Sequence, residues 1–365
     1  MKPLFITSVS DYAGKNLLLT GLGLKMQSDG YRINFFKPLG NRPMRLERIL
    51  SDEDAAFFHE IFGLKNQLTA ATAVLLTDEL LERLLAGRWK IDLVEKINQA
   101  LKKFTEADIT LIKGVSRFYR GSILGSSEIS LIKEFNWPTI VVDRLTFTGE
   151  TIDGFMGAKR SLGNLLLGVV FNYVPLTKMS YLKKKVVPFL KKNKVEVLGI
   201  IPQSAALESV SVKEIKNALS ADLICGKDRL ENTVEKFCPG IMNVENALRY
   251  FRREMGHHVG YPTVECLAVV TEGDRADIQL AALESNACCL ILTGHLYPDD
   301  IILSRAEERN VPVLVVHDDT LKIMNKLEKL TKHIGLETLS KVKEANKIVR
   351  ANVNIKAIYQ KLGLR

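Results

Sequence analysis

The chain has 365 residues, enough for two or three domains that each bury a core of their own. Hydrophobic residues make up 46% and charged residues 25%, which is ordinary for a soluble globular protein. No apolar run approaches the roughly 18 residues of a membrane span, and the start, Met1-Lys2-Pro3, does not resemble a signal peptide. We therefore expect a cytoplasmic protein without a membrane partner.

The formal net charge of +9 comes partly from lysine clusters at 183–185 and 191–194. Such runs can bind nucleic acid, but here they share a predicted helix with apolar residues and no aromatic side chains interleave with them. This favours a solvated helix face over a nucleic-acid site. The five cysteines show no CxxC spacing, so we expect buried, reduced thiols rather than disulfides or zinc ligands. His257 and His258 have no cysteine or acid at ligand spacing, which argues against a metal there.

The residues after the first predicted strand, 4–7, form the pattern of a phosphate-binding loop. A polar segment leads to Gly14-Lys15, which open a predicted helix over 15–28. In such a loop the backbone N–H groups face an anion and the lysine reaches its outer phosphates. Ser8 or Val9 stands in place of the usual first glycine, and Asn16 replaces the usual magnesium-binding Ser/Thr. The alternative is that Gly14 merely starts a helix.

Short apolar runs then alternate with helical patterns, which predicts a parallel α/β sheet that binds ligands at the carboxyl edge of its strands. The expected strands are 4–7, 33–36, 109–112, 139–142, 165–171 and 195–200, and the expected helices are 15–28, 52–62, 78–86, 93–104, 128–135 and 181–191. The residues that follow these strands are Lys37-Pro38, Lys113-Gly114, Asp143-Arg144, Asn172 and Pro202. The acids of 51–54 indicate a helix N-cap and first turn.

The order of these motifs resembles the dethiobiotin-synthetase-like P-loop fold. The motifs are Thr7-Ser8, Gly14-Lys15, Lys37-Pro38, Asp52 and Asp54, 113–125, 169–172 and 198–202. The version found at the N-terminus of long phosphotransacetylases, and in their stand-alone relatives, is more similar still, including 52–55 and 75–80. The resemblance covers residues 1–205 and implies ATP or another nucleotide as the ligand.

The resemblance also implies roles for individual residues. Ser8, Gly14, Lys15 and Asn16 belong to the phosphate loop, Lys37 matches a lysine on the substrate or phosphate side, and Asp52 or Asp54 matches a magnesium-binding aspartate. Asn172 and Pro202 match in type the residues that contact the base. Lys113, however, stands where the family has a magnesium-binding glutamate. A cation there disfavours the metal on which phosphoryl transfer relies, so magnesium is doubtful and efficient ATP hydrolysis is not expected. The alternative is that Lys113 points away from the site.

From residue 206 the pattern restarts. A capping-box serine begins a helix at 211–214, and further helices are expected at 244–253, 276–286 and 299–309, with strands at 221–224, 264–271, 289–292 and 313–316. Asp274-Arg275 and Thr293-Gly294 follow neighbouring strands and can line one crevice. They resemble the signature of the DRTGG domain, with His295 in place of its last glycine. The alternatives are that Asp274 caps a helix, that Arg275 pairs with Asp274 or Asp277, and that His295 is a loop substitution.

The C-terminal residues 318–365 are predicted to be helical. An amphipathic stripe runs through Ile323, Leu327, Leu330 and Ile334 to a stop at Gly335 and continues through Val342, Val349, Val353 and Ile358. This face can cover the rest of the chain or a second subunit, and the sequence does not separate the two.

The expected architecture is therefore α/β, with a P-loop domain at 1–205, a DRTGG domain at 206–317 and a helical tail at 318–365. The chain ends at Arg365, so the acetyl-transferring domain of phosphotransacetylases is not expected. The leading hypothesis is a regulatory homodimer that binds a nucleotide or small phosphorylated ligand. The alternatives are an ATP-dependent ligase of the dethiobiotin synthetase or cobyrinic acid a,c-diamide synthase type, and a scaffold that has lost ligand binding.

Overall fold

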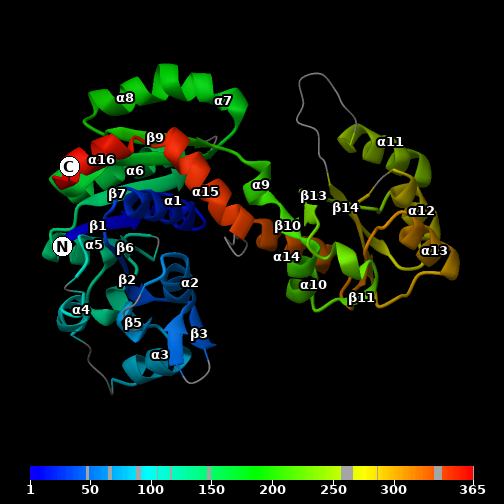
Figure 1. The fold of residues 1–365 in the computed structure, drawn as a ribbon, viewed down its shortest axis with the longest axis horizontal. Coiled ribbons are helices and arrows are strands. Elements are labelled where there is room, and N and C mark those ends of the chain that lie inside the picture. The colour runs from blue at the N-terminus through cyan, green and yellow to red at the C-terminus, as the bar shows by residue number, and fades with distance from the viewer. Residues whose placement is uncertain are drawn as a thin grey trace. The chain divides into compact units, whose positions relative to one another are not determined.

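In a computed structural model of the chain, the residues divide into two units (Figure 1). Unit 1 comprises Met1–Gln203 and Leu336–Arg365, and unit 2 comprises Ser204–Gly335. The structure describes residues 1–46, 49–64, 68–87, 92–104, 106–115, 117–145, 149–255, 266–285, 287–332 and 339–364. None of the helices in these ranges is long and apolar enough to cross a membrane.

Unit 1 is built on a seven-stranded sheet in the order β5-β2-β6-β1-β7-β8-β9, and every strand pair in it is parallel. The strands are β1 (Lys2–Thr7), β2 (Ile33–Gly40), β5 (Thr72–Leu75), β6 (Ile109–Lys113), β7 (Thr139–Arg144), β8 (Leu166–Val174) and β9 (Val197–Pro202). A hairpin of β3 (Pro43–Leu46) and β4 (Ile49–Asp52) follows β2. The expected parallel sheet, with Gly14-Lys15 after its first strand, is confirmed.

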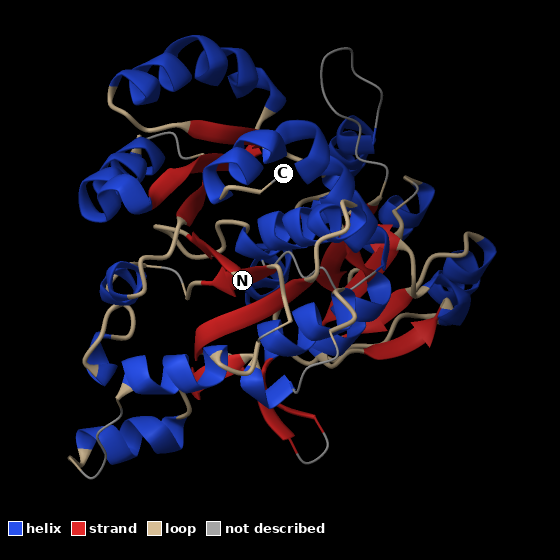
Figure 2. Cartoon of the chain, turned by 60° about the vertical axis from the view of Figure 1, so that its left-hand side comes forward, coloured by secondary structure: helices blue, strands red, loops and turns tan. Residues whose placement is uncertain are grey.

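Helices cover both faces of this sheet (Figure 2). They are α1 (Lys15–Ser28), α2 (Glu53–Ile61), α3 (Asp78–Leu85), α4 (Leu93–Leu101), α5 (Glu128–Glu134), α6 (Glu150–Leu162), α7 (Leu176–Tyr181) and α8 (Val187–Lys192), with short helical turns η1 (Leu68–Ala70), η2 (Ser122–Leu124) and η3 (Gly163–Leu165). The single helix expected at 181–191 is interrupted by a π-helical turn, η4 (Leu182–Val186). The turn ends two residues before Pro188, which lacks the N–H that a regular α-helix would use. The lysines at 183–185 are exposed, as a solvated face requires.

The C-terminal helices α15 (Leu339–Asn352) and α16 (Ile355–Leu362) belong to unit 1, whereas α14 (Thr320–Lys332) belongs to unit 2. Helix α15 lies beside α1, where a Cβ on Gly21 would meet the Val349 side chain at 2.3 Å. Val353 forms a bridge with Gly199 of β9. The apolar face of 342–358 is therefore covered by the chain itself. Ile334 and Gly335 of the predicted stripe lie outside the described residues.

Unit 2 has a five-stranded sheet in the order β11-β16-β15-β14-β13, antiparallel between β11 and β16 and parallel elsewhere. The strands are β11 (Asp222–Cys225), β13 (Lys236–Pro239), β14 (Leu267–Glu272), β15 (Cys289–Thr293) and β16 (Val313–Val315), and β10 (Val210–Ser211) pairs with β12 (Thr233–Val234). The other helices are α9 (Ala205–Glu208), α10 (Val212–Leu219), α11 (Val244–Met255), α12 (Ala276–Glu284), α13 (Asp300–Glu308) and the turn η5 (Lys227–Arg229). In one core layer, helices α11, α12 and α13 pack against the sheet. In the other, helices α10 and α14 pack against the sheet.

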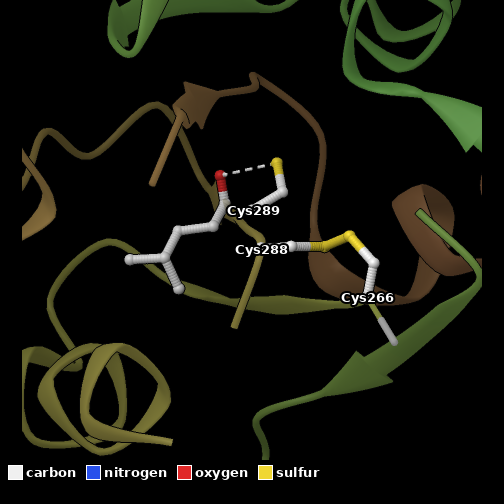
Figure 3. The surroundings of a disulfide bond; sticks show 4 residues. Cys266, Cys288 and Cys289 are labelled. Carbon is white, nitrogen blue, oxygen red and sulfur yellow. Dashed lines mark hydrogen bonds between the residues drawn. A yellow bond between two sulfur atoms is a disulfide. The ribbon is translucent and has the colours of Figure 1, made fainter. Parts of the chain in front are cut away.

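The expectation of reduced thiols is wrong for one pair of cysteines, because Cys266 and Cys288 form a disulfide (Figure 3). The two residues immediately precede the adjacent parallel strands β14 and β15, which bring their Cα atoms to 5.3 Å. A search for CxxC spacing misses such a pair because the sheet, and not the local sequence, brings the residues together. The thiols of Cys225, Cys238 and Cys289 are buried, as expected.

Candidate functional site

The P-loop (residues 8–15) connects β1 to α1 and closes around its own lysine. Gly14 has φ 98°, a left-handed conformation that favours glycine, and is the N-cap of α1. The Lys15 ammonium donates to Ser8 Oγ at 2.9 Å, and Ser8 Oγ donates to the Ser10 carbonyl at 2.6 Å. Burial lowers the pKa of Lys15 to about 8, although Glu128 and Asp54 oppose the shift.

Two polar residues from neighbouring strands hold this loop. Asp143 Oδ2 accepts from the backbone N–H groups of Val9 and Ser10 at 3.1 and 2.9 Å. The Asn172 side chain donates to the Ala13 carbonyl at 3.0 Å and lies directly over Gly14, where a Cβ would come within 1.8 Å of Asn172 Nδ2. Asn172 therefore positions the loop in this structure, and its contact with a base stays a prediction.

A buried ion network reaches the start of α1, where the Asn16 side chain donates to Asp54. Lys37 is 1% exposed, and its ammonium donates to both oxygens of Asp52 and to Asp54 Oδ2 at 2.6 to 2.9 Å. Asp52 is also the N-cap of α2 and accepts from the Asp54 N–H, which confirms the expected helix start. Lys37 and Pro38 lie within β2 rather than after it, because the strand continues to Gly40 by pairing with β5.

Lys113, the last residue of β6, points into this network. Its ammonium lies 2.5 Å from Asp54 Oδ2. Burial lowers the pKa of Lys113 to about 7, with Asp54 opposing the shift. Burial alone would raise the pKa of the Asp54 carboxyl, but the ammonium groups of Lys113 and Lys37 outweigh it and hold that pKa well below its usual range. Asp54 is thus a buried carboxylate neutralised by the chain's own cations.

Glu128 is a buried residue of the site that the sequence analysis did not single out. It accepts from the Thr7 hydroxyl and from the Val115 N–H, and burial raises the pKa of its carboxyl. Together with Lys113 and Gly114 it lines a cavity of about 10 Å³. Its only signal in the sequence is an acid in the first turn of a helix, which capping alone explains.

The carboxylate oxygens that could hold a magnesium ion are engaged with the chain's own donors. The cation would need oxygen ligands from Asn16 and from Asp52 or Asp54. Asp54 Oδ1 instead accepts from Asn16 Nδ2 at 3.1 Å, and Asp54 Oδ2 accepts from two lysines. Asn16 Oδ1 is the buried oxygen of this group that has no hydrogen-bond partner. The Lys113 ammonium lies against Asp54 Oδ2, an oxygen that a bound ion would use.

The four DRTGG residues lie at one edge of the unit 2 sheet. Glu272 of β14 is in register with Thr293 of β15, and Gly273 donates to the Thr293 carbonyl at 3.4 Å. The Thr293 hydroxyl contacts the Thr320 hydroxyl at 2.8 Å. The Arg275 guanidinium is directed to Asp277 and to the Met242 carbonyl, so the ion pair anticipated as one alternative is present.

The structure thus brings together most of the predicted site residues within each unit. Ser8, Gly14, Lys15, Asn16, Lys37, Asp52, Asp54, Lys113 and Asn172 surround the P-loop, and Asp274, Arg275, Thr293 and Gly294 follow two adjacent strands. Pro202 ends β9, beyond β7 and β8 from the P-loop strand. Binding by any of these residues stays a prediction. His257 and His258 lie outside the described residues.

Residues 2–211 match the family of an AAA domain, and residues 214–330 match the DRTGG domain. The phosphate acetyltransferase of Nitratidesulfovibrio vulgaris is 24% identical over 90% of this chain and 47% of its own length, and that of Synechocystis sp. is 21% identical over the same shares. The chain spans about half the length of these relatives. Among solved structures, the CBS and DRTGG domains of the regulatory region of Clostridium perfringens pyrophosphatase, complexed with the activator diadenosine tetraphosphate, are similar. That match has a TM-score of 0.26 and 17% identity and covers 43% of this chain and 72% of the other.

The first match covers more than half of the chain and coincides with the parallel sheet, the P-loop and the buried lysines. The second coincides with the sheet that carries Asp274-Arg275 and Thr293-Gly294. The chain therefore belongs to this AAA domain family, in its dethiobiotin-synthetase-like P-loop form, and carries a DRTGG domain after it.

Proposed function

We propose that this chain is a regulatory protein related to the N-terminal part of phosphate acetyltransferases. It binds a nucleotide or small phosphorylated metabolite at the P-loop, without magnesium and with little or no ATP hydrolysis. The homology to phosphate acetyltransferases over about half of their length supports the relationship. We expect the protein to act as a homodimer.

The observation that carries the proposal is the ammonium of Lys113 on Asp54. The family places a carboxylate and its metal at this position, as the resemblance implies. Here the chain supplies its own cation, which neutralises charge but provides no coordination geometry for an attacking or leaving oxygen. Anion binding survives this exchange, because the P-loop backbone and the lysines remain, whereas efficient phosphoryl transfer does not.

Calorimetric titration with ATP, ADP and GTP, each with and without magnesium, tests the proposal. We expect binding without magnesium, held by charge-assisted hydrogen bonds that contribute about 1.5–3 kcal/mol each. Magnesium should leave the affinity unchanged or weaken it, because chelation removes charge that the lysines would otherwise meet. Lys15→Ala should abolish binding, and Lys96→Ala, on the exposed face of α4, is the matched control.

The variant Lys113→Glu should reverse the magnesium dependence by restoring an anionic ligand beside the phosphates. Asn16→Thr in the same chain should strengthen the reversal, because it restores the usual hydroxyl ligand. Circular dichroism of each variant checks that it folds. Binding of ATP by the wild type only with magnesium would contradict the account of Lys113. Magnesium-dependent turnover of about 1 per second or more, abolished by Lys15→Ala, would favour the ligase instead.

A further inference from the structure

Three metal-ligating side chains meet on the surface of unit 2, outside both predicted sites. They are Asp222, His295 and His317, and one ligand atom from each lies within 4.8 Å of the others. Across the ranges that the structure describes, no other group of three such residues comes as close. The two imidazole rings are stacked, with centroids 3.9 Å apart and planes inclined by 16°.

The backbone fixes the two histidines as neighbours. His295 donates its N–H to the Val316 carbonyl at 2.8 Å, and Gly294 donates to the Asp318 carbonyl at 3.2 Å. The segments that follow the parallel strands β15 and β16 are thereby joined on both sides of His317. This pairing places His295 and His317 on neighbouring segments.

Asp222 reaches the same edge from the opposite direction. It is the first residue of β11, which runs antiparallel to β16, and it pairs with Val315, two residues before His317. The Tyr297 hydroxyl donates to Asp222 Oδ2 at 3.3 Å, and its ring meets the His295 ring edge-on at 5.4 Å. Hydrogen bonds of this kind orient a carboxylate for metal binding.

The backbone at His295 is one that glycine usually occupies. His295 has φ 56° and follows Gly294 with φ 79°, so two successive residues are left-handed. Side chains other than glycine adopt this conformation at a cost, although histidine tolerates it better than most. Glycine adopts this backbone without penalty, so the chain carries a metal-ligating side chain where a conformationally easier residue would serve.

We propose that Asp222, His295 and His317 bind a divalent cation of the zinc class. Two imidazoles and one carboxylate are a common ligand set for such an ion and leave a fourth tetrahedral position open for water or an anion. Bonds of about 2.0–2.1 Å require ligand atoms closer together than 4.8 Å. All three side chains are exposed, so rotation about their side-chain bonds brings them together without displacing the core.

Titration of the EDTA-stripped full chain with Zn²⁺ by calorimetry, and with Co²⁺ by visible absorption, tests the proposal. We expect the wild type to bind one ion at this site and to show the absorption of tetrahedral Co²⁺. His317→Ala and Asp222→Asn should each weaken binding at least about tenfold. His295→Gly should do the same while folding normally, because glycine adopts this backbone without penalty.

The double variant His257→Ala/His258→Ala is the control, because it removes two histidines that lie outside the proposed site. It should retain the affinity and the Co²⁺ spectrum of the wild type. The proposal is overturned if His295→Gly and His317→Ala bind Zn²⁺ as tightly as the wild type, or if binding is lost only in the control. Failure of the wild type to bind at millimolar Zn²⁺ would overturn it as well.

Discussion

Both sheets have polar side chains at their carboxyl edges, but the two edges differ in how far these side chains are buried and in how their charges are neutralised. In unit 1, Lys37, Lys113 and Asp54 are at most 7% exposed and neutralise one another. In unit 2, Asp222, His295 and His317 are all exposed to solvent. The first edge carries its counter-ions in the chain, whereas the second offers ligand atoms to an ion from solution.

Burial explains this difference. A carboxylate removed from water is tolerated only when a cation and hydrogen bonds replace its hydration, so Asp54 requires a cation beside it. Exposed groups such as Asp222 keep their hydration and can release or accept a ligand at little cost. We therefore expect the buried edge of unit 1 to keep one arrangement of its charged side chains. We expect the exposed edge of unit 2 to rearrange when an ion binds.

The largest effect should come from removing a buried cation. Lys37→Met leaves Asp52 and Asp54 with one fewer partner and should destabilise unit 1 by about 3–5 kcal/mol. Urea unfolding followed by tryptophan fluorescence measures this, because the two tryptophans of the chain, Trp89 and Trp137, lie in the sequence of unit 1. The exposed Lys96→Met should change stability within error. A loss below about 1 kcal/mol in Lys37→Met would contradict the view that burial makes this network indispensable.

Next in size is the disulfide, which stabilises the other region. All five cysteines lie in unit 2, and the Cys266–Cys288 bond closes a loop with a sequence separation of 22. The double change Cys266→Ser/Cys288→Ser should lower the free energy of unfolding of unit 2 by about 3 kcal/mol, because the open loop has more freedom when unfolded. Dithiothreitol should have the same effect on the calorimetric transition of unit 2 and leave the tryptophan-reported transition unchanged. Equal shifts in both transitions would show that the two units do not unfold separately.

The sequence predicted the strand-helix alternation well, because periodicity and capping are local signals. Helix α1 and the capping box at Ser211 agree with the expected positions. The edge strand β5 was missed, and with it the continuation of β2 through Lys37, because Thr72–Leu75 is a short run without a clear alternation. Pairing with a neighbour, and not local preference, makes that segment a strand.

The contacts of the candidate site were harder to predict, because they depend on where side chains point. Spacing alone left open whether Lys113 faced Asp54, and only the assembled sheet brings these residues together. The place of Glu128 in the site could not be predicted for the same reason, because its partners Thr7 and Val115 come from two other segments. The histidine pair of unit 2 likewise arises from two segments that the sheet places side by side.

A further prediction concerns pH and the charged edge of unit 1. The pKa of Lys113 is about 7 and that of Lys15 about 8, so both ammonium groups are present at low pH and are lost as the pH rises through these values. Affinity for ADP without magnesium should therefore fall between pH 6.5 and 9, by about tenfold or more for each lysine that loses its proton. Because a bound phosphate stabilises the charged form of the lysines, the pH at which the affinity falls is higher than the pKa values of the unliganded protein. Calorimetry at a series of pH values measures it. Lys113→Arg, which keeps its charge, should show a smaller fall, and an affinity that rises with pH would contradict the assignment.

The smallest effect on stability should come from Arg275, the charged residue of the DRTGG signature. Its ion pair with Asp277 is partly exposed, with side chains 33% and 47% accessible, and solvent screens pairs of this kind. Arg275→Ala should therefore change the unfolding of unit 2 far less than Lys37→Met changes that of unit 1, and calorimetry of the unit 2 transition measures it. Arg275→Lys keeps the charge but not the forked geometry, so it separates loss of charge from loss of the Met242 carbonyl contact. If Arg275→Ala lowered the free energy of unfolding as much as Lys37→Met does, then the exposure of an ion pair would not determine how much it contributes to stability. If stability is unchanged and binding of an anionic ligand to unit 2 is lost, then Arg275 is held at the surface to meet that ligand.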